Sequence, residues 1–193
     1  MLLQKRSIAR LLRHFPTFAT LAPALPTLNS FASVRVCRQD MPALLSMHET
    51  TQGEVLFRFT GHLIPINTGD RCLQVGAQRW MTPDPEQDEP PWVYLNHSFD
   101  PSVHISHTPL PETEDTSAAA EPLVLTATAN HNLPIDAPLT IDYTLHEHIM
   151  FDDGFVCAES LREVRGFHYL TQEEQAHSLP RAMEHIQRLH TGK

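Results

Sequence analysis

Asn-His-Ser-Phe-Asp-Pro-Ser fills residues 96–102, and Leu-Thr-Ile-Asp-Tyr fills residues 139–143. The first stretch is polar and runs into a Pro, which is typical of a turn. The second is apolar and β-branched up to its final Asp and Tyr, which is typical of the end of a strand. Between them, residues 123–129 (LVLTATA) predict a central strand, because β-branched and apolar side chains favour buried sheet positions. Each stretch alone is ordinary in a β protein, so the information lies in their order.

Short alternating segments continue on both sides of these stretches. Three of them predict further strands: residues 53–60 (GEVLFRFT), 71–76 (RCLQVG) and 103–106 (VHIS). Residues 171–190 predict a helix, in which Thr171 and Glu174 form a capping box and Pro180 divides the helix into two pieces. The pattern therefore predicts a small, mainly β domain with a C-terminal helix.

The composition excludes several classes of function. The chain has 193 residues, 41% of them hydrophobic, which suffices for one domain with a real core. It has 14 Lys and Arg against 23 Asp and Glu, which argues against binding nucleic acid through bulk positive charge and suits a basic partner. With only 7 Gly and neither GxGxxG nor GxxxxGK[ST], a glycine-rich phosphate loop is not expected. No apolar run is long enough to predict a transmembrane helix.

Residues 1–36 differ from the rest because they contain no acidic residue. They include Lys and Arg at five positions: Lys5, Arg6, Arg10, Arg13 and Arg35. Residues 2–13 (LLQKRSIARLLR) can form a basic amphipathic helix, which is typical of a mitochondrial or plastid transit peptide. A disordered basic tail and a misassigned start codon are the alternatives, and without a leader the protein would be cytoplasmic or nuclear. Without this segment, the body is more acidic than the whole chain.

The two opening stretches resemble the signature motifs of SET-domain protein-lysine methyltransferases, commonly written NHSCxPN and ELTIDY. Flanking segments resemble the same family: residues 53–57 (GEVLF), 72–76 (CLQVG), 127–143 and 155–167, the last of which is similar to a post-SET segment. The resemblance covers roughly residues 41–170. It implies a mainly β, β-clip-like fold of small sheets with a pseudoknot and short helices.

The same resemblance implies a division of the chain into three parts. Residues 1–36 would be the leader or tail, residues 37–150 the SET domain, and residues 151–193 a post-SET-like segment with the C-terminal helix. SET domains transfer a methyl group from S-adenosylmethionine to a lysine amine, so a basic protein or peptide is the expected substrate. No direct binding to nucleic acid or to a membrane is expected.

Specific residues take roles from this resemblance. Tyr143 matches the active-site tyrosine, whose hydroxyl would orient the amine and the methyl group. Asn96 and His97 match positions that hold the cofactor, and Ala43 and Leu44 correspond to the early cofactor loop. In the post-SET-like segment, Phe155 is expected to close over the cofactor as part of an apolar clasp with Phe167 and Tyr169.

The chain also departs from the family pattern. The early loop usually carries GxG, which lets the backbone approach the cofactor, but Met41-Pro42-Ala43 contains no glycine. The motif Cys is replaced by Phe99, the final Asn of the motif by Ser102, and Cys157 is the one thiol left in the post-SET-like segment. One thiolate cannot hold a tetrahedral zinc ion, so no zinc is expected. A SET-like domain that binds a peptide or partner without catalysis is therefore the alternative.

The chain has 13 His, and two groups of them have a spacing that could suit metal ligands. His104 and His107 lie beside a predicted strand, and His146 and His148 flank Glu147. A metal site needs three or four converging ligands. Because many His in a polar chain produce such groups by chance, solvated surface is the favoured interpretation.

Two other features give weaker indications of function. Ser98 beside His97 invites a hydrolase interpretation, but GxSxG is missing and no glycines flank the serine. Acidic loops are predicted at residues 82–91 and 112–121. These loops are either solvated surface, or their negative charge attracts a basic segment of the substrate.

Overall fold

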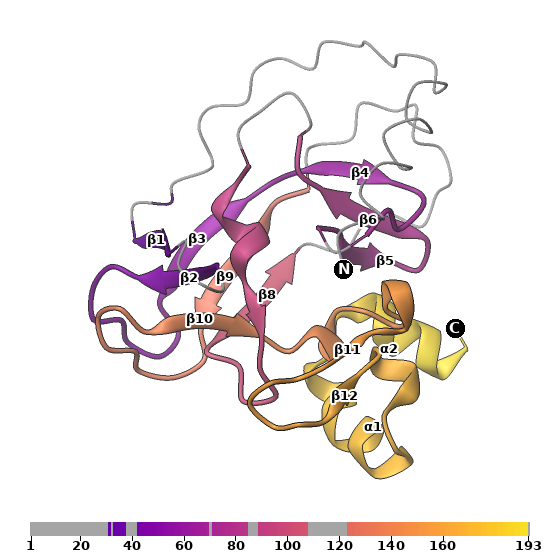
Figure 1. The fold of residues 1–193 in the computed structure, drawn as a ribbon. Coiled ribbons are helices and arrows are strands. Elements are labelled where there is room, and N and C mark those ends of the chain that lie inside the picture. The colour runs from indigo at the N-terminus through magenta and orange to yellow at the C-terminus, as the bar shows by residue number, and fades with distance from the viewer. Residues whose placement is uncertain are drawn as a thin grey trace, which may run out of the picture.

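The computed structural model describes residues 31, 33–37, 42–69, 71–84, 89–107 and 123–192 (Figure 1). The amphipathic segment at residues 2–13 and the acidic loop at residues 112–121 therefore lie outside the described residues, and the loop at residues 82–91 is described in part. No described helix has the length and apolar character needed to cross a bilayer.

The described strands are short and form four small sheets. The first has the order β1 (Val34–Cys37), β2 (Ala43–Ser46), β10 (Pro138–Ile141) and β7 (Asn96–His97). The second has the order β3 (Val55–Phe59), β9 (Leu125–Ala129) and β8 (Val103–His107). The third has the order β4 (His62–Ile64), β6 (Arg79–Thr82) and β5 (Leu73–Gly76). The fourth is the hairpin of β11 (Phe155–Val156) and β12 (Glu163–Val164).

The helices are also short. Within the described residues five are 3-10 turns: η2 (Pro91–Tyr94), η3 (Tyr143–Leu145), η4 (Phe151–Asp153), η5 (Phe167–Tyr169) and η6 (Leu179–Arg181). Two are α-helices, α1 (Gln172–Ser178) and α2 (Glu184–Thr191), which lie together beside the sheets, next to the β11–β12 hairpin (Figure 1).

The main core lies between the first three sheets. β9 alternates buried and half-buried residues, with Leu125 and Ala127 fully buried, because successive side chains of a strand point to opposite faces. Phe59 from β3 stacks on Trp92 from η2, with ring centroids 5.3 Å apart. Burial of one such aromatic side chain stabilises the fold by about 1.5–3 kcal/mol.

A second, smaller core fixes the C-terminal helices to the motif strands. Phe167 and Ile186 are fully buried there, together with Leu145 and Met183. The Met183 amide also donates a hydrogen bond to the Leu145 carbonyl over 2.9 Å. The C-terminal helices therefore pack against η3, the turn that follows β10 in the chain and begins at Tyr143.

The predicted fold class is confirmed: the chain is mainly β, in small sheets with short helices. β9 is the central strand of its sheet, as its composition predicts. The capping box is present, since the Thr171 hydroxyl accepts from the Glu174 amide and the Glu174 carboxylate accepts from the Thr171 amide. Pro180 lies in η6 and separates α1 from α2. β1 begins at Val34 and pairs with β2, so the last residues of the segment 1–36, expected to be a leader or a tail, belong to the first sheet.

Candidate active site

The two motif stretches lie side by side because β7 and β10 pair in parallel. Thr140 is opposite Asn96 and Ile141 is opposite His97. One residue further, the Ser98 amide donates a hydrogen bond to the Ile141 carbonyl over 3.1 Å. Parallel pairing brings the same ends of both strands together, so the residues that follow them, Ser98 and Asp142, emerge at one edge of the sheet.

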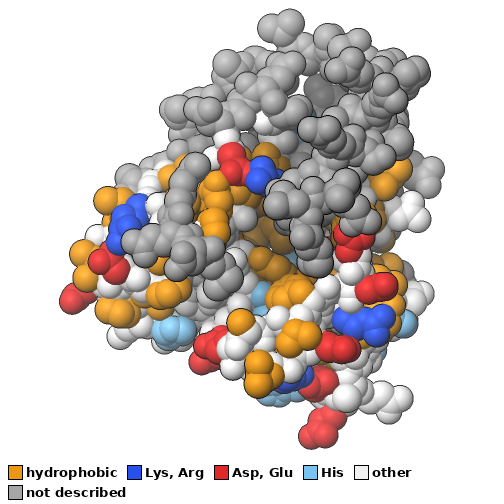
Figure 2. Space-filling view, in the orientation of Figure 1, with side chains coloured by type: hydrophobic (Ala, Val, Ile, Leu, Met, Phe, Trp, Pro, Cys, Tyr) orange, Lys and Arg blue, Asp and Glu red, His pale blue; other side chains and the backbone are white. Residues whose placement is uncertain are grey.

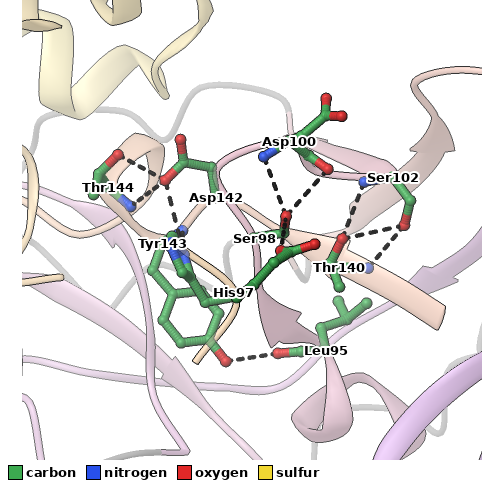
Figure 3. A network of polar contacts seen from close by, with 10 residues as sticks. Leu95, His97, Ser98, Asp100, Ser102, Thr140, Asp142, Tyr143 and Thr144 are labelled. Carbon is green, nitrogen blue, oxygen red and sulfur yellow. Dashed lines mark hydrogen bonds and ion pairs between the residues drawn. The ribbon is translucent and has the colours of Figure 1, made fainter. Parts of the chain in front are cut away.

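Tyr143 begins η3 directly after β10, and its position is set at two points. Its backbone amide donates to His97 Nδ1 over 3.1 Å, and its hydroxyl donates to the Leu95 carbonyl over 2.7 Å (Figure 3). The turn itself is capped by Asp142, whose Oδ1 accepts from the Thr144 amide at 2.9 Å and from the Thr144 hydroxyl at 2.7 Å. Tyr143 therefore lies directly against the Asn-His-Ser turn.

His97 is a neutral imidazole held inside the site. Its side chain is only 1% exposed, and burial, followed by the nearby Arg162 charge, lowers its pKa to about 4. Because Nδ1 accepts the Tyr143 amide, the proton is assigned to Nε2. That Nε2 is buried and has no hydrogen-bond partner among the described residues, which marks it as a donor in need of an acceptor.

Aromatic rings surround this imidazole. Edge contacts reach it from Phe99 at 4.5 Å, from Tyr143 at 5.3 Å and from Phe155 at 5.7 Å between ring centroids. Phe155 also meets the Tyr143 ring at 5.9 Å, while 40% of its surface stays exposed. The ring of Phe155, from the β11–β12 hairpin, therefore lies against both His97 and Tyr143.

The early segment lies next to Asn96. The Asn96 side chain donates from Nδ2 to the Pro42 carbonyl over 2.9 Å, directly before β2. Ala43 is half-buried, whereas Leu44 is fully buried and pairs with Leu139 of β10, so its side chain is enclosed in the core. Of Ala43 and Leu44, Ala43 is therefore the residue that is partly exposed near Asn96.

Two contacts join the motif turn to its neighbours. Asn96 bonds the Pro42 main chain, and His97 meets the ring of Phe155. The unpartnered Nε2–H of His97 suits a hydrogen-bond acceptor, and aromatic rings suit a heterocycle or a cation.

A cavity of about 490 Å³ lies beside this cluster. Asp142 and Leu145 line it from the motif side, and Arg181 of η6 lines it from the C-terminal side. Burial raises the pKa of Asp142, while its hydrogen bonds from Thr144 and the Arg181 charge work in the opposite direction. The lining does not include Tyr143, so this cavity neighbours the tyrosine through Asp142 rather than enclosing it.

The apolar clasp expected from the post-SET-like segment is present at one residue of three. Phe155 lies against the site, but Phe167 is fully buried in the second core, and Tyr169 is half-exposed beneath the Arg165 guanidinium. Pairing of the Phe167 amide with the Glu147 carbonyl turns that ring inward. Sequence reasoning missed Glu159 and Arg162 of the same hairpin, which reach Ser98 and Phe99.

The surface interpretation of the His146-Glu147-His148 group is wrong for its first two members. His146 is 3% and Glu147 6% exposed, because they follow η3 into the second core rather than lying on an exposed strand. Burial lowers the pKa of His146 to about 3 and raises that of Glu147 to about 7. Among the described ranges, no group of three or more His, Cys, Asp or Glu could hold a metal ion. His104 is exposed and His107 half-buried, on β8.

No protein-family model matches the chain, and no curated protein sequence matches it. Among solved structures, it is similar to a Plasmodium falciparum "putative histone methyltransferase". That similarity has a TM-score of 0.42 and 15% sequence identity, and it covers 57% of this chain and 92% of the other.

Proposed function

We propose that this protein transfers a methyl group from S-adenosylmethionine to a lysine side chain of a basic protein. The observation that carries the proposal is the position of Tyr143, which is fixed to His97 through its amide and faces Phe155 from the hairpin. The two motif stretches were expected to meet if the resemblance to SET domains extends to the site, and β7 and β10 pair as required. The acidic composition of the chain supports a basic substrate.

The chain's own residues suit this chemistry. When bound, S-adenosylmethionine supplies a methyl group on a cationic sulfonium, and transfer needs a neutral amine in line with the methyl–sulfur bond. The lysine nitrogen forms the new bond to the methyl carbon, the carbon–sulfur bond breaks, and the amine proton leaves to solvent. Lysine has an unperturbed pKa of about 10.4, so a low-dielectric site favours its neutral form. Phe155 and the edge of His97 provide apolar surface for that purpose.

The Tyr143 hydroxyl would orient the amine. Its proton is donated to the Leu95 carbonyl, so the phenolic oxygen presents its lone pairs to other donors. An amine that donates N–H to this oxygen has its own lone pair turned in a set direction. Holding a nucleophile in this way at near-attack distance supplies several kcal/mol of the barrier.

The test is methylation of a lysine-centred basic peptide library with labelled S-adenosylmethionine. Tyr143→Phe removes the oxygen that accepts the amine, and we expect the rate to fall by about 100-fold. The cofactor-induced increase in thermal stability should be kept. Tyr169→Phe is the matched control, because Tyr169 is half-exposed on η5. Equal rates for the wild type and Tyr143→Phe would remove Tyr143 from the mechanism.

A SET-like domain that binds a partner without catalysis is the second candidate. The early segment favours it, since Pro42 removes a backbone donor and its carbonyl is already engaged by Asn96. A thermal shift distinguishes the two candidates, because a ligand far above its dissociation constant stabilises the fold by a few kcal/mol. No shift at millimolar S-adenosylmethionine would favour the binding module.

A further inference from the structure

The β11–β12 hairpin carries Phe155 onto the site, yet it has little core of its own. Cys157 and Val164 are buried, whereas Phe155, Val156 and Leu161 are 40%, 59% and 79% exposed. Figure 2 shows hydrophobic and acidic side chains next to one another over the lower part of the face where Figure 1 places this hairpin. Burial therefore covers Cys157 and Val164, while the outer side chains of the hairpin bury little apolar surface.

Two further contacts join the turn of the hairpin to the Asn-His-Ser turn. The Arg162 guanidinium carbon lies 4.1 Å from the centroid of the Phe99 ring, a cation–π contact. The Ser98 hydroxyl donates to Glu159 Oε2 over 2.9 Å. Both partners belong to the turn between β11 and β12, which is closed by a hydrogen bond of 2.8 Å from the Cys157 amide to the Arg162 carbonyl.

Arg162 also connects the hairpin to the C-terminal helices. Its guanidinium forms an ion pair with Glu174, the residue that completes the capping box of α1. Its charge adds to the lowering of the His97 pKa by burial, and it opposes the rise that burial causes in the pKa of Asp142. One side chain thus contacts the motif turn and α1 while belonging to the hairpin that bears Phe155.

We propose that Arg162 and Glu159 are positioning residues that latch the β11–β12 hairpin onto Phe99 and Ser98, and so keep Phe155 against Tyr143 and His97. The latch is defined here as these two contacts. Its link to catalysis rests on the proposed methyltransferase function, but the latch itself does not. Without it, Phe155 would leave Tyr143 and expose that side of the site to water.

Fluorine NMR can detect the latch directly, because the chain has only 3 Tyr. In protein labelled with 3-fluorotyrosine, Tyr143 reports the ring current of Phe155 and His97, whose centroids lie 5.9 and 5.3 Å away. Tyr143→Phe and Tyr169→Phe assign the signals. The variant is Arg162→Leu, which removes the guanidinium at a side chain that is 46% exposed, so the fold should persist.

Arg165→Leu is the matched control, since Arg165 makes the same kind of contact over Tyr169, at 4.2 Å. We expect Arg162→Leu to shift the Tyr143 signal and leave Tyr169 in place, and Arg165→Leu to do the reverse. The Cys157 amide should exchange with solvent at least 10-fold faster in Arg162→Leu alone. Arg162→Lys keeps the charge but not the planar stacking, and should move the signal part of the way.

An unchanged Tyr143 signal and unchanged Cys157 exchange in Arg162→Leu would overturn the latch. Glu159→Ala attacks the second contact without touching Arg162 and should move the same signal. If the wild type shows no methyl transfer while the fluorine pattern holds, the proposed function fails and the latch stands. If activity is present, kcat/KM should fall in Arg162→Leu and remain near the wild-type value in Arg165→Leu.

Discussion

Thr140 and Ser102 join the two motif stretches by a reciprocal pair of contacts. The Ser102 amide donates to the Thr140 hydroxyl over 3.1 Å, and the Thr140 amide donates to the Ser102 hydroxyl over 2.8 Å (Figure 3). Ser102 is 6% exposed, so removal of its acceptor leaves a buried N–H unpaired. Thr140→Val should therefore reduce the free energy of unfolding by about 1–3 kcal/mol in urea titrations.

Thr126→Val is the control for this prediction. Thr126 is half-buried on β9, and the described contacts include no hydrogen bond of its hydroxyl. The same change of shape there should alter the free energy of unfolding by less than about 0.5 kcal/mol. Equal losses in the two variants would mean that the hydroxyl of Thr140 contributes nothing specific.

At the residue scale, sequence reasoning identified the two motif residues of the candidate site but not the hairpin residues that contact the motif turn. Tyr143 and His97 were singled out because both lie in stretches that resemble the SET-domain motifs. Glu159 and Arg162 were not, because a cation–π contact and a hydrogen bond between distant turns leave no period or motif. Leu44 was assigned to the early cofactor loop, and the structure shows that its side chain is fully buried.

Gly154 sets where the hairpin begins, and Gly53 provides a comparison within the same chain. Gly154 has φ of +87° and Gly53 has φ of +84°, a region that L side chains enter at a cost of roughly 1–2 kcal/mol. A Cβ at Gly154 would lie 2.0 Å from the Val164 carbonyl oxygen of β12, whereas a Cβ at Gly53 would meet nothing within 4 Å. The two positions therefore share a positive φ but differ in close approach.

We expect Gly53→Ala to lower the free energy of unfolding by roughly 1–2 kcal/mol, and Gly154→Ala to lower it by more. In Gly154→Ala the carbonyl clash should also separate β11 from β12, so the Tyr143 fluorine signal should shift as in Arg162→Leu. Gly53→Ala should leave that signal unchanged. Similar losses and unshifted signals in both variants would show that the hairpin tolerates the added methyl group.

Elements were predictable where one local pattern sufficed. Alternation identified β3 and β8, and the capping box with Pro180 described α1 and its end. β11 and β12 have two residues each, too few for a period to show. β1 and β2 were missed because their identity as strands depends on pairing with each other and with β10.

At the scale of the whole molecule, four buried groups make stability depend on pH. Burial lowers the pKa of His97 and His185 to about 4 and that of His146 to about 3, so each stays neutral in the folded chain from pH 6.5 down to near its lowered pKa. The unfolded chain binds those three protons, and stability falls as pH falls. Glu147 acts in the opposite sense, because burial raises its pKa to about 7 and the folded chain keeps a proton that the unfolded chain has lost.

Between about pH 4.5 and 6.5, these groups predict a net uptake of about two protons on unfolding. The free energy of unfolding should rise with pH in that window, by about 1.4 kcal/mol per pH unit for each proton. Partial desolvation also lowers the pKa of His104, on the exposed side of β8, and that of half-buried His148, which acts in the same direction. Composition could not reveal this dependence, because 13 His in a polar chain predict exposed imidazoles.

Two variants should change the slope of the free energy of unfolding against pH in opposite directions. His185→Gln keeps a donor for the His146 carbonyl, which His185 contacts at 2.8 Å, but cannot titrate, so the slope should fall by about one proton. Glu147→Gln keeps an acceptor for the Gln74 amide and removes the opposing group, so the slope should rise by about one proton. Urea titrations at intervals from pH 4.5 to 6.5 measure both, with His177→Gln on the exposed side of α1 as control. Slopes that move in the same direction would contradict this assignment, since the buried imidazoles and the buried carboxyl group must oppose each other if each keeps its neutral form in the folded chain.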